Sequence, residues 1–190
     1  MFFKNKNEKI LSEVINSNYA VIYFKPDGTV IKANEVFLKT MGYSLEEFVG
    51  KHHSMFCEEK FTKTQEYKDG WNDLRAGKTL TAEFQRVKKD KSLIFLRASY
   101  MPIIENGKVL EVIKLAQDIT KNRLKNLFFI GQVKAINKSN AVIEFDMNGN
   151  ILNANDNFLN TLGYKKEDII GKYHSIFCEE NYKNSNEYKE

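Results

Sequence analysis

His53 and Cys57 lie four positions apart, a spacing that would place both side chains on one face of a helix. An imidazole beside a thiol can hold the thiol as a thiolate, and both groups are ligands for a metal such as Zn²⁺. Two ligands do not complete a tetrahedral zinc site, so zinc would require a second pair. The alternative is a small buried thiol that packs beside Phe56.

The chain contains this pair twice, within the decapeptides "GKHHSMFCEE" and "GKYHSIFCEE". His174 and Cys178 repeat His53 and Cys57 at an offset of 121 positions, and the flanking sequence aligns without a gap. Solenoid repeats have periods of about 20–50 residues, so this longer period predicts tandem domains. Any chemistry of the pair is expected to be duplicated with the domain.

The order of elements within the first copy predicts an α+β domain. Strand-like runs over 20–24 and 29–33 are joined by a Pro-Asp-Gly turn, and Asn34 can cap the helix that follows. A longer helix is predicted over 62–76, and three further strands over 80–87, 92–104 and 108–119. The second copy ends at the counterpart of Asp69, so it holds only the first half of the domain.

The sequence thus predicts four regions: a helix over 1–17, a domain over 18–120, a connecting helix over 121–138, and half of a second domain over 139–190. Half a domain would bury little of its apolar surface, so we interpret the end at Glu190 as a fragment or an engineered boundary. Both predicted flanking helices carry apolar stripes, through which we expect the chain to form a homodimer. These stripes comprise Ile10, Leu11, Val14 and Ile15, and then Leu124, Leu127, Phe128, Val133 and Ile136.

The composition excludes several classes of function. A net charge of +4 with interspersed lysines and acids gives no basic stripe for nucleic acid. No apolar run approaches the roughly 20 residues of a membrane span, and the N-terminus has no cleavable leader pattern. We therefore expect a cytosolic chain with reduced cysteines. Ser54 has a neighbouring histidine but no orienting acid, and no phosphate-binding glycine loop is present, so we do not expect an enzyme.

Several motifs together resemble the PAS sensor domain: the opening hairpin, Asn34 after its second strand, "GY" at 42–43, "EEFVGK", the three-strand half and the terminal "QDIT". The resemblance covers 17–120 in full and 138–190 in part. Among PAS domains the chain is most similar to those of chemoreceptors of the aerotaxis and biofilm-dispersion type. Gly50, His53, Phe56, Trp71 and the "LRAG" that begins at Leu74 carry that likeness.

The resemblance implies a five-stranded antiparallel sheet with helices on one face, enclosing a pocket for a cofactor or ligand. It also implies that Asp118, Ile119 and Thr120 lead into a signalling helix, with the output domain outside this chain. The candidate pocket residues are His53, Trp71, Cys57, His52, Phe56 and His174.

The cofactor stays open between heme, FAD and none. Light-sensing relatives need a Gly-x-Asn-Cys motif, but His53 occupies the position of that cysteine, so no FMN photoadduct is expected. Aerotaxis receptors hold FAD with an Arg-His pair where this chain has Cys57 and Glu58. Heme would need an axial imidazole, for which His53 is preferred because Tyr173 replaces His52 in the second copy. The alternative is a hydrogen-bonded structural histidine.

We therefore expect a sensory input module that relays a small ligand, gas or redox state through the helix after Thr120. The alternative is a cofactor-free PAS module that serves only for dimerisation.

Overall fold

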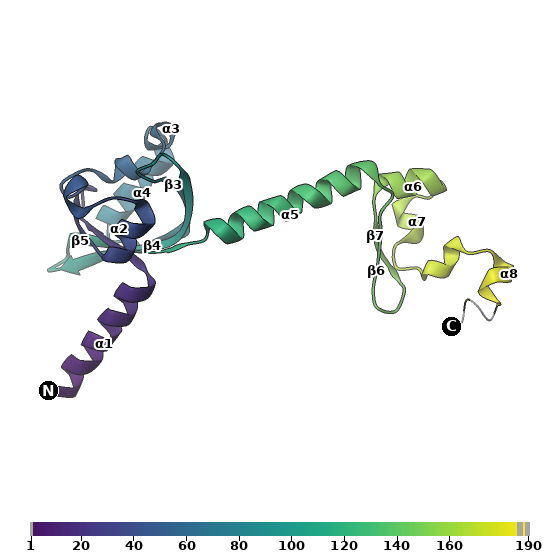
Figure 1. Cartoon of the computed structure of the whole chain (residues 1–190), viewed down its shortest axis with the longest axis horizontal. Coiled ribbons are helices and arrows are strands. Elements are labelled where there is room, and N and C mark those ends of the chain that lie inside the picture. The colour runs from purple at the N-terminus through teal and green to yellow at the C-terminus, as the bar shows by residue number, and fades with distance from the viewer. Residues whose placement is uncertain (1, 186–187, 189–190) are drawn as a thin grey trace. The chain divides into compact units, whose positions relative to one another are not determined.

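The computed structural model describes residues 2–185 and 188. The chain divides into two compact units, Met1–Leu124 and Lys125–Glu190, which are considered separately (Figure 1). No helix among the described residues is long and apolar enough to span a membrane.

Unit 1 is built on one five-stranded sheet in the order β2-β1-β5-β4-β3, in which every neighbouring pair is antiparallel. The sequence expectation of an α+β fold with this sheet is confirmed. The hairpin between β4 and β5 turns at Asn106 and Gly107, which both have positive φ. The strands are β1 (Ala20–Phe24), β2 (Val30–Ala33), β3 (Leu80–Val87), β4 (Leu93–Glu105) and β5 (Lys108–Asp118).

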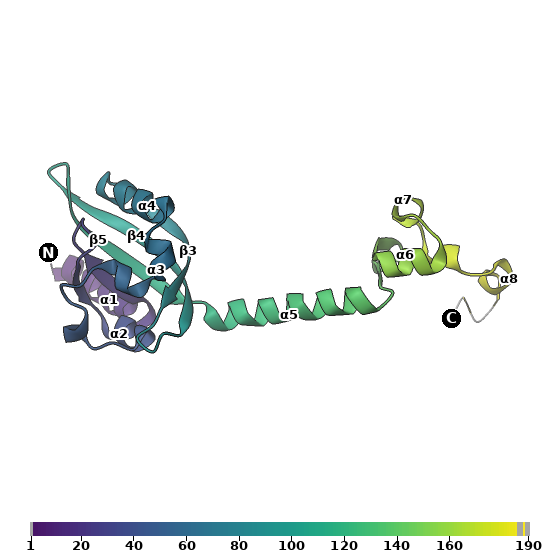
Figure 2. The same cartoon turned by 90° about the horizontal axis from the view of Figure 1, so that it is seen from above.

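Helices pack against this sheet, as Figure 2 shows, with α2 contacting β1 and α4 contacting β3 and β4. The helix predicted over 62–76 begins three residues later, at Gln65, because Thr64 adopts an extended conformation and its hydroxyl caps α4 by accepting from the Tyr67 amide at 3.2 Å. The helical elements of the domain are α2 (Glu35–Met41), η1 (Leu45–Glu47), η2 (His53–Phe56), α3 (Glu59–Thr62) and α4 (Gln65–Arg75), preceded by α1 (Phe2–Asn18); η denotes a 3₁₀ helix.

The core of unit 1 is rich in aromatic rings. Phe24 from β1 contacts Trp71 from α4 and Tyr100 from β4, with ring centroids 5.7 and 6.3 Å apart. Phe37 and Phe56 meet edge to face at 5.4 Å. Such pairs add specific geometry to the apolar area that they bury, so the core fixes the relative positions of the sheet and helices.

Unit 2 repeats the first elements of unit 1 in the same order. A two-stranded antiparallel sheet is followed by short helices, and a small cluster of Ile151, Ala154, Leu159 and Ile169 is buried. The elements are β6 (Ile143–Phe145), β7 (Ile151–Ala154), α6 (Asp156–Leu162), α7 (Lys166–Ile169), η3 (His174–Phe177) and α8 (Glu180–Lys183).

Helix α5 (Thr120–Ser139) begins directly after β5 and runs across the boundary of the two units. None of its side chains is buried, and Phe128 is 68% exposed. The apolar residues of the predicted stripe are therefore exposed on this helix, together with Phe129 and Ile130.

Candidate functional site

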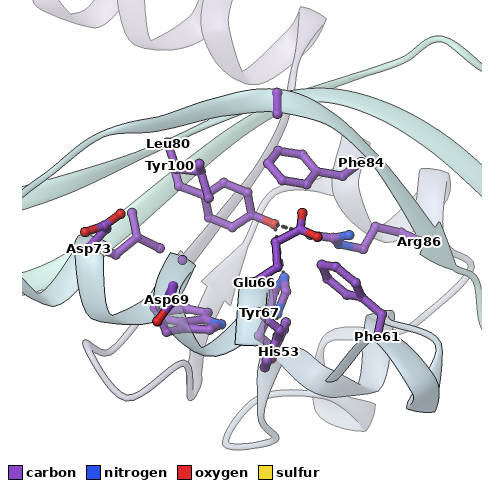
Figure 3. A pocket seen from close by; sticks show the side chains of 14 residues that line it. His53, Phe61, Glu66, Tyr67, Asp69, Asp73, Leu80, Phe84, Arg86 and Tyr100 are labelled. Carbon is purple, nitrogen blue, oxygen red and sulfur yellow. Dashed lines mark hydrogen bonds between the residues drawn. The ribbon is translucent and has the colours of Figure 1, made fainter. Parts of the chain in front are cut away.

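A cavity of about 370 Å³ lies in unit 1 between α4 and the strands β3 and β4. Figure 3 shows Tyr100, Phe84 and Arg86 reaching it from the strands and His53 and Tyr67 from the helical side. The volume lies within the range of small-molecule sites. Its wall is mostly apolar and aromatic, formed by Phe61, Tyr67, Trp71, Leu74, Leu80, Ala82, Phe84 and Tyr100, with His53, Glu66, Asp69, Gly70, Asp73 and Arg86 completing it.

His53 is the centre of a hydrogen-bonded chain in the wall of this cavity. Its side chain is buried, and Nδ1 lies 3.0 Å from the Tyr67 hydroxyl while Nε2 lies 3.0 Å from the Tyr100 hydroxyl. The turn at Gly28 positions the residue, because the Gly28 carbonyl accepts a 2.8 Å hydrogen bond from the His53 amide. The imidazole is thus oriented by two phenols from different elements.

Tyr100 connects this chain to two buried cations. Arg86 donates from Nη2 to the Tyr100 hydroxyl at 3.2 Å. The Lys114 Nζ lies 4.9 Å from the centre of the Tyr100 ring, at the strand position directly opposite. Arg86 and Lys114 are only 4% and 3% exposed, so both are held among apolar groups.

Burial and these cations determine the protonation states. Burial lowers the pKa of His53 well below its usual value, and the charges of Arg86 and Lys114 lower it further, so the imidazole is neutral near pH 7. Burial alone would raise the pKa of Tyr100, but the two cations hold it below the ordinary phenol value. Burial also lowers the pKa of Lys114. The site is therefore electropositive around a neutral histidine.

Of the sequence candidates, His53 and Trp71 line the cavity. Cys57 is buried beside them, with Sγ 3.8 Å from the His53 Nδ1, although the segment is a 3₁₀ turn instead of the helix that we expected. Burial raises the pKa of this thiol, which disfavours a thiolate at neutral pH. Phe56 is part of the aromatic core.

His52 lies outside the cavity wall and has a structural contact of its own. Its Nδ1 accepts from the Ser54 amide at 3.2 Å at the start of η2, and its Nε2 lies 3.0 Å from the Asp27 carbonyl. His174 belongs to unit 2, is half-buried, and has its Nε2 3.4 Å from the Tyr188 hydroxyl. His52 therefore does not line the cavity of unit 1.

The arrangement does not fit a heme bound through His53. Both ring nitrogens are occupied by the phenols of Tyr67 and Tyr100, so iron coordination would first have to break one of these hydrogen bonds. No group of three or more His, Cys, Asp or Glu side chains within 2–185 and 188 could hold a metal ion.

Sequence reasoning missed Arg86, Tyr100 and Lys114. The alternation of inward and outward side chains along each strand could have identified them. Arg86 shares the inward face with Phe84, and Lys114 lies between the buried residues Val112 and Ala116. A charged residue at an inward position of a strand marks a buried charge, which the composition alone does not reveal.

The family model described as "PAS domain" matches residues 18–121 and 139–189 of this chain. The biofilm dispersion protein BdlA of Pseudomonas aeruginosa is 34% identical over 175 residues, which is 92% of this chain. The chain spans only 42% of the length of that relative.

Two solved structures share the fold at low sequence identity. One is an RNA-binding light-oxygen-voltage receptor, with a TM-score of 0.56 and 19% identity, covering 67% of this chain and 37% of that one. Another is the PAS domain of a protein from Colwellia psychrerythraea, with a TM-score of 0.52 and 20% identity, covering 60% and 97%.

Proposed function

The chain belongs to the PAS domain family, and from this premise we propose that unit 1 is a sensory input module that binds a small ligand and relays its presence through α5. The observation that carries the proposal is the cavity of about 370 Å³ with a polar, buried cluster in an otherwise apolar wall. Such a pocket with a few convergent polar groups is typical of a ligand site. The proposed role is binding and relay instead of catalysis.

Hydrogen bonds hold the start of α5 to β4, the strand that also carries Tyr100 of the cavity wall, and this supports the relay. The Thr120 hydroxyl accepts a 2.9 Å hydrogen bond from the Phe95 amide of β4, and the Ile119 amide donates to the Phe95 carbonyl at 2.9 Å. Asp118 accepts from the Thr120 amide at 2.8 Å. Tyr100 also belongs to β4. A ligand that shifts this strand would therefore also shift Phe95 and its hydrogen bonds to the start of α5.

Such a relay requires a ligand that binds one arrangement of β4 and α5 better than another. The similarity to the biofilm dispersion protein supports a role in signal transduction, and we propose that the output domain is a separate part of a chemoreceptor-like protein. The signal is carried by whichever molecule occupies the cavity.

A second candidate is a cofactor-free dimerisation module, and the exposed apolar side chains of the flanking helices favour it. Leu11 and Val14 on α1 are exposed, as are Phe128 and Phe129 on α5. Apolar surface of this kind marks an interaction site more often than an inert surface.

The test combines spectroscopy with hydrogen exchange on the full chain. An absorption spectrum and native mass spectrometry of the purified protein identify any bound molecule, and amide exchange follows α5 before and after that molecule is removed. The sensory proposal expects a change in exchange protection over the first turn of α5. Thr120→Val keeps the shape but removes the hydroxyl acceptor, so it should abolish that change while ligand binding persists.

The two candidates have opposite outcomes in this test. A chain without any bound molecule, whose sedimentation shows a dimer that Phe128→Ser dissociates, would support the dimerisation module and contradict the sensory one. Ligand-dependent exchange in α5 that survives Thr120→Val would contradict the proposed route of the relay.

A further inference from the structure

Two buried cations of unit 1 have no carboxylate partner. Arg86 and Lys114 are at least nine-tenths buried, yet neither takes part in an ion pair within the part of the chain that the structure describes. A buried charge is costly unless it is paired, because the interior solvates it poorly. The Tyr100 phenol is the polar group between them.

Arg86 retains unused hydrogen-bonding capacity at the cavity. Its Nη1 donates to the Gln85 carbonyl at 2.7 Å and its Nη2 to Tyr100, but its buried Nε has no partner. The guanidinium carries five N–H donors in a fixed fork that matches the geometry of a carboxylate. Figure 3 shows the head group beside Phe84 and Phe61, at the cavity wall.

The rest of the cavity is suited to a flat apolar body. Trp71, Leu74, Leu80 and Phe84 line it, and the Arg86 guanidinium carbon lies 4.7 Å from the centre of the Phe84 ring. Rings that present their faces and edges to a cavity favour an aromatic or branched ligand.

Three exposed carboxylates, those of Glu66, Asp69 and Asp73, lie on α4 in the outer wall. They repel a ligand that carries a second negative charge at its outer end. The charge pattern therefore selects an anion whose single carboxylate lies innermost.

We propose that the cavity of unit 1 binds a small monocarboxylate with an aromatic or branched apolar body, whose carboxylate pairs with Arg86. This inference rests on the proposed function and adds the chemical class of the ligand. Lys114 contributes positive potential from the neighbouring strand, and Tyr100 shares its hydroxyl with Arg86 and His53.

The test uses two matched pairs of probes, benzoate with benzamide and phenylacetate with phenylacetamide, which share an apolar body and differ in charge. Trp71 is the only tryptophan of the chain and lines the cavity, so its fluorescence reports binding. We expect the better carboxylate to bind roughly 10- to 100-fold more tightly than its amide, which is the range of a charge-assisted hydrogen bond. Arg86→Gln should remove that preference.

Arg97→Gln is the matched control, since Arg97 lies on β4, is exposed and pairs with Glu83 at 3.0 Å. It should retain the full preference of the unsubstituted chain. Near-UV circular dichroism verifies that Arg86→Gln is folded. If it is not, the comparison of carboxylate with amide on the unsubstituted chain still decides the question.

Equal binding of the acid and its amide would overturn the proposal, as would an absence of binding by both carboxylates. An Arg86→Gln variant that is folded and keeps the preference would overturn the assignment to Arg86. These failures leave the sensory role standing if native mass spectrometry finds another ligand that changes exchange in α5. Conversely, carboxylate binding without any change in α5 would support this site and contradict the relay.

Discussion

Units 1 and 2 contain similar local sequences, identical at about half of the aligned positions, and build equivalent local elements, but they bury them to very different extents. Phe24 in β1 is fully buried, whereas its counterpart Phe145 in β6 is 42% exposed. His53 is buried and His174 is half-buried, although each begins an equivalent 3₁₀ turn. The groups that enclose Phe24 and His53 include Trp71 and Tyr100, which follow the repeated segment in the chain.

Local hydrogen bonds are preserved where long-range packing is not. The Asn34 Oδ1 accepts from the Phe37 amide at 2.9 Å and from the Val21 amide at 3.0 Å. Asn155 makes the equivalent two bonds in unit 2, both at 2.9 Å. Short-range sequence thus determines turns and caps, while the cavity and its electrostatics require the strands β3 to β5.

The largest effect is expected from removing the aromatic ring of Phe24, which is buried in unit 1 while its counterpart Phe145 is exposed in unit 2. Phe24→Ala should lower the free energy of unfolding of unit 1 by about 3–5 kcal/mol, because it opens a cavity among packed rings. Phe145→Ala is the matched control and should leave the unfolding transition reported by Trp71 fluorescence unchanged. Denaturant titration of the full chain measures both. A loss below about 1 kcal/mol for Phe24→Ala would show that the ring is not part of a tight core.

A smaller loss is expected from the cap that the two units share. Asn34→Ala should destabilise unit 1 by about 2 kcal/mol, since it removes the cap of α2 and leaves the Val21 amide unpaired. Asn34→Asp keeps the acceptor oxygen but loses the 2.8 Å bond to the Tyr19 carbonyl, so it should cost less than Asn34→Ala. Equal midpoints for the two variants would mean that the acceptor oxygen contributes nothing.

The rates at which the two cysteine thiols react also compare the burial of units 1 and 2. Cys57 is buried and Cys178 is half-buried, so Ellman's reagent should modify Cys57 at least about tenfold more slowly. The variants Cys178→Ser and Cys57→Ser each leave one thiol for this measurement. Both thiols should react alike in strong denaturant, and equal rates in the native state would contradict the enclosed position of Cys57.

The smallest expected effect is that of pH on the stability of unit 1. Because the pKa of His53 is lowered in the folded state, the unfolded chain binds more protons below about pH 6.5. The stability of unit 1 should therefore be retained above that pH and decrease as the pH falls, by at most about 1.4 kcal/mol per unit from this residue. Urea titrations between pH 5 and 8 measure the slope.

His53→Gln should flatten this dependence. A slope that persists in His53→Gln would assign the titration to another group.

The sequence predicted much of the fold because its signals are local. The Asn34 cap, the strand over 80–87 and the turn that ends at Gly28 each depend on neighbouring residues, and the structure has them at those positions. The helix predicted over 62–76 is present as α4 but begins three residues later, at Gln65, because Thr64 is its cap. Its side chain competes for a backbone amide, which periodicity does not detect.

The site was less predictable, since its chemistry depends on register. His53 and Trp71 were named from the sequence and do line the cavity. The partners of His53 lie 14 and 47 positions further along the chain, at Tyr67 and Tyr100. Which strand residue opposes which is set by tertiary pairing, so Lys114 facing Tyr100 becomes evident only in the folded sheet.

The junction at Thr120 has a consequence for the architecture of proteins that contain this unit. Phe95 and Asp118 hold Thr120 at the start of α5, and the Ile119 carbonyl accepts from the Arg123 amide at 2.8 Å in its first turn. The direction and rotational phase of the emerging helix are therefore determined upstream of whatever sequence continues it. A domain of this kind can be joined to different helical effectors by recombination, and each new fusion inherits the same angular starting point.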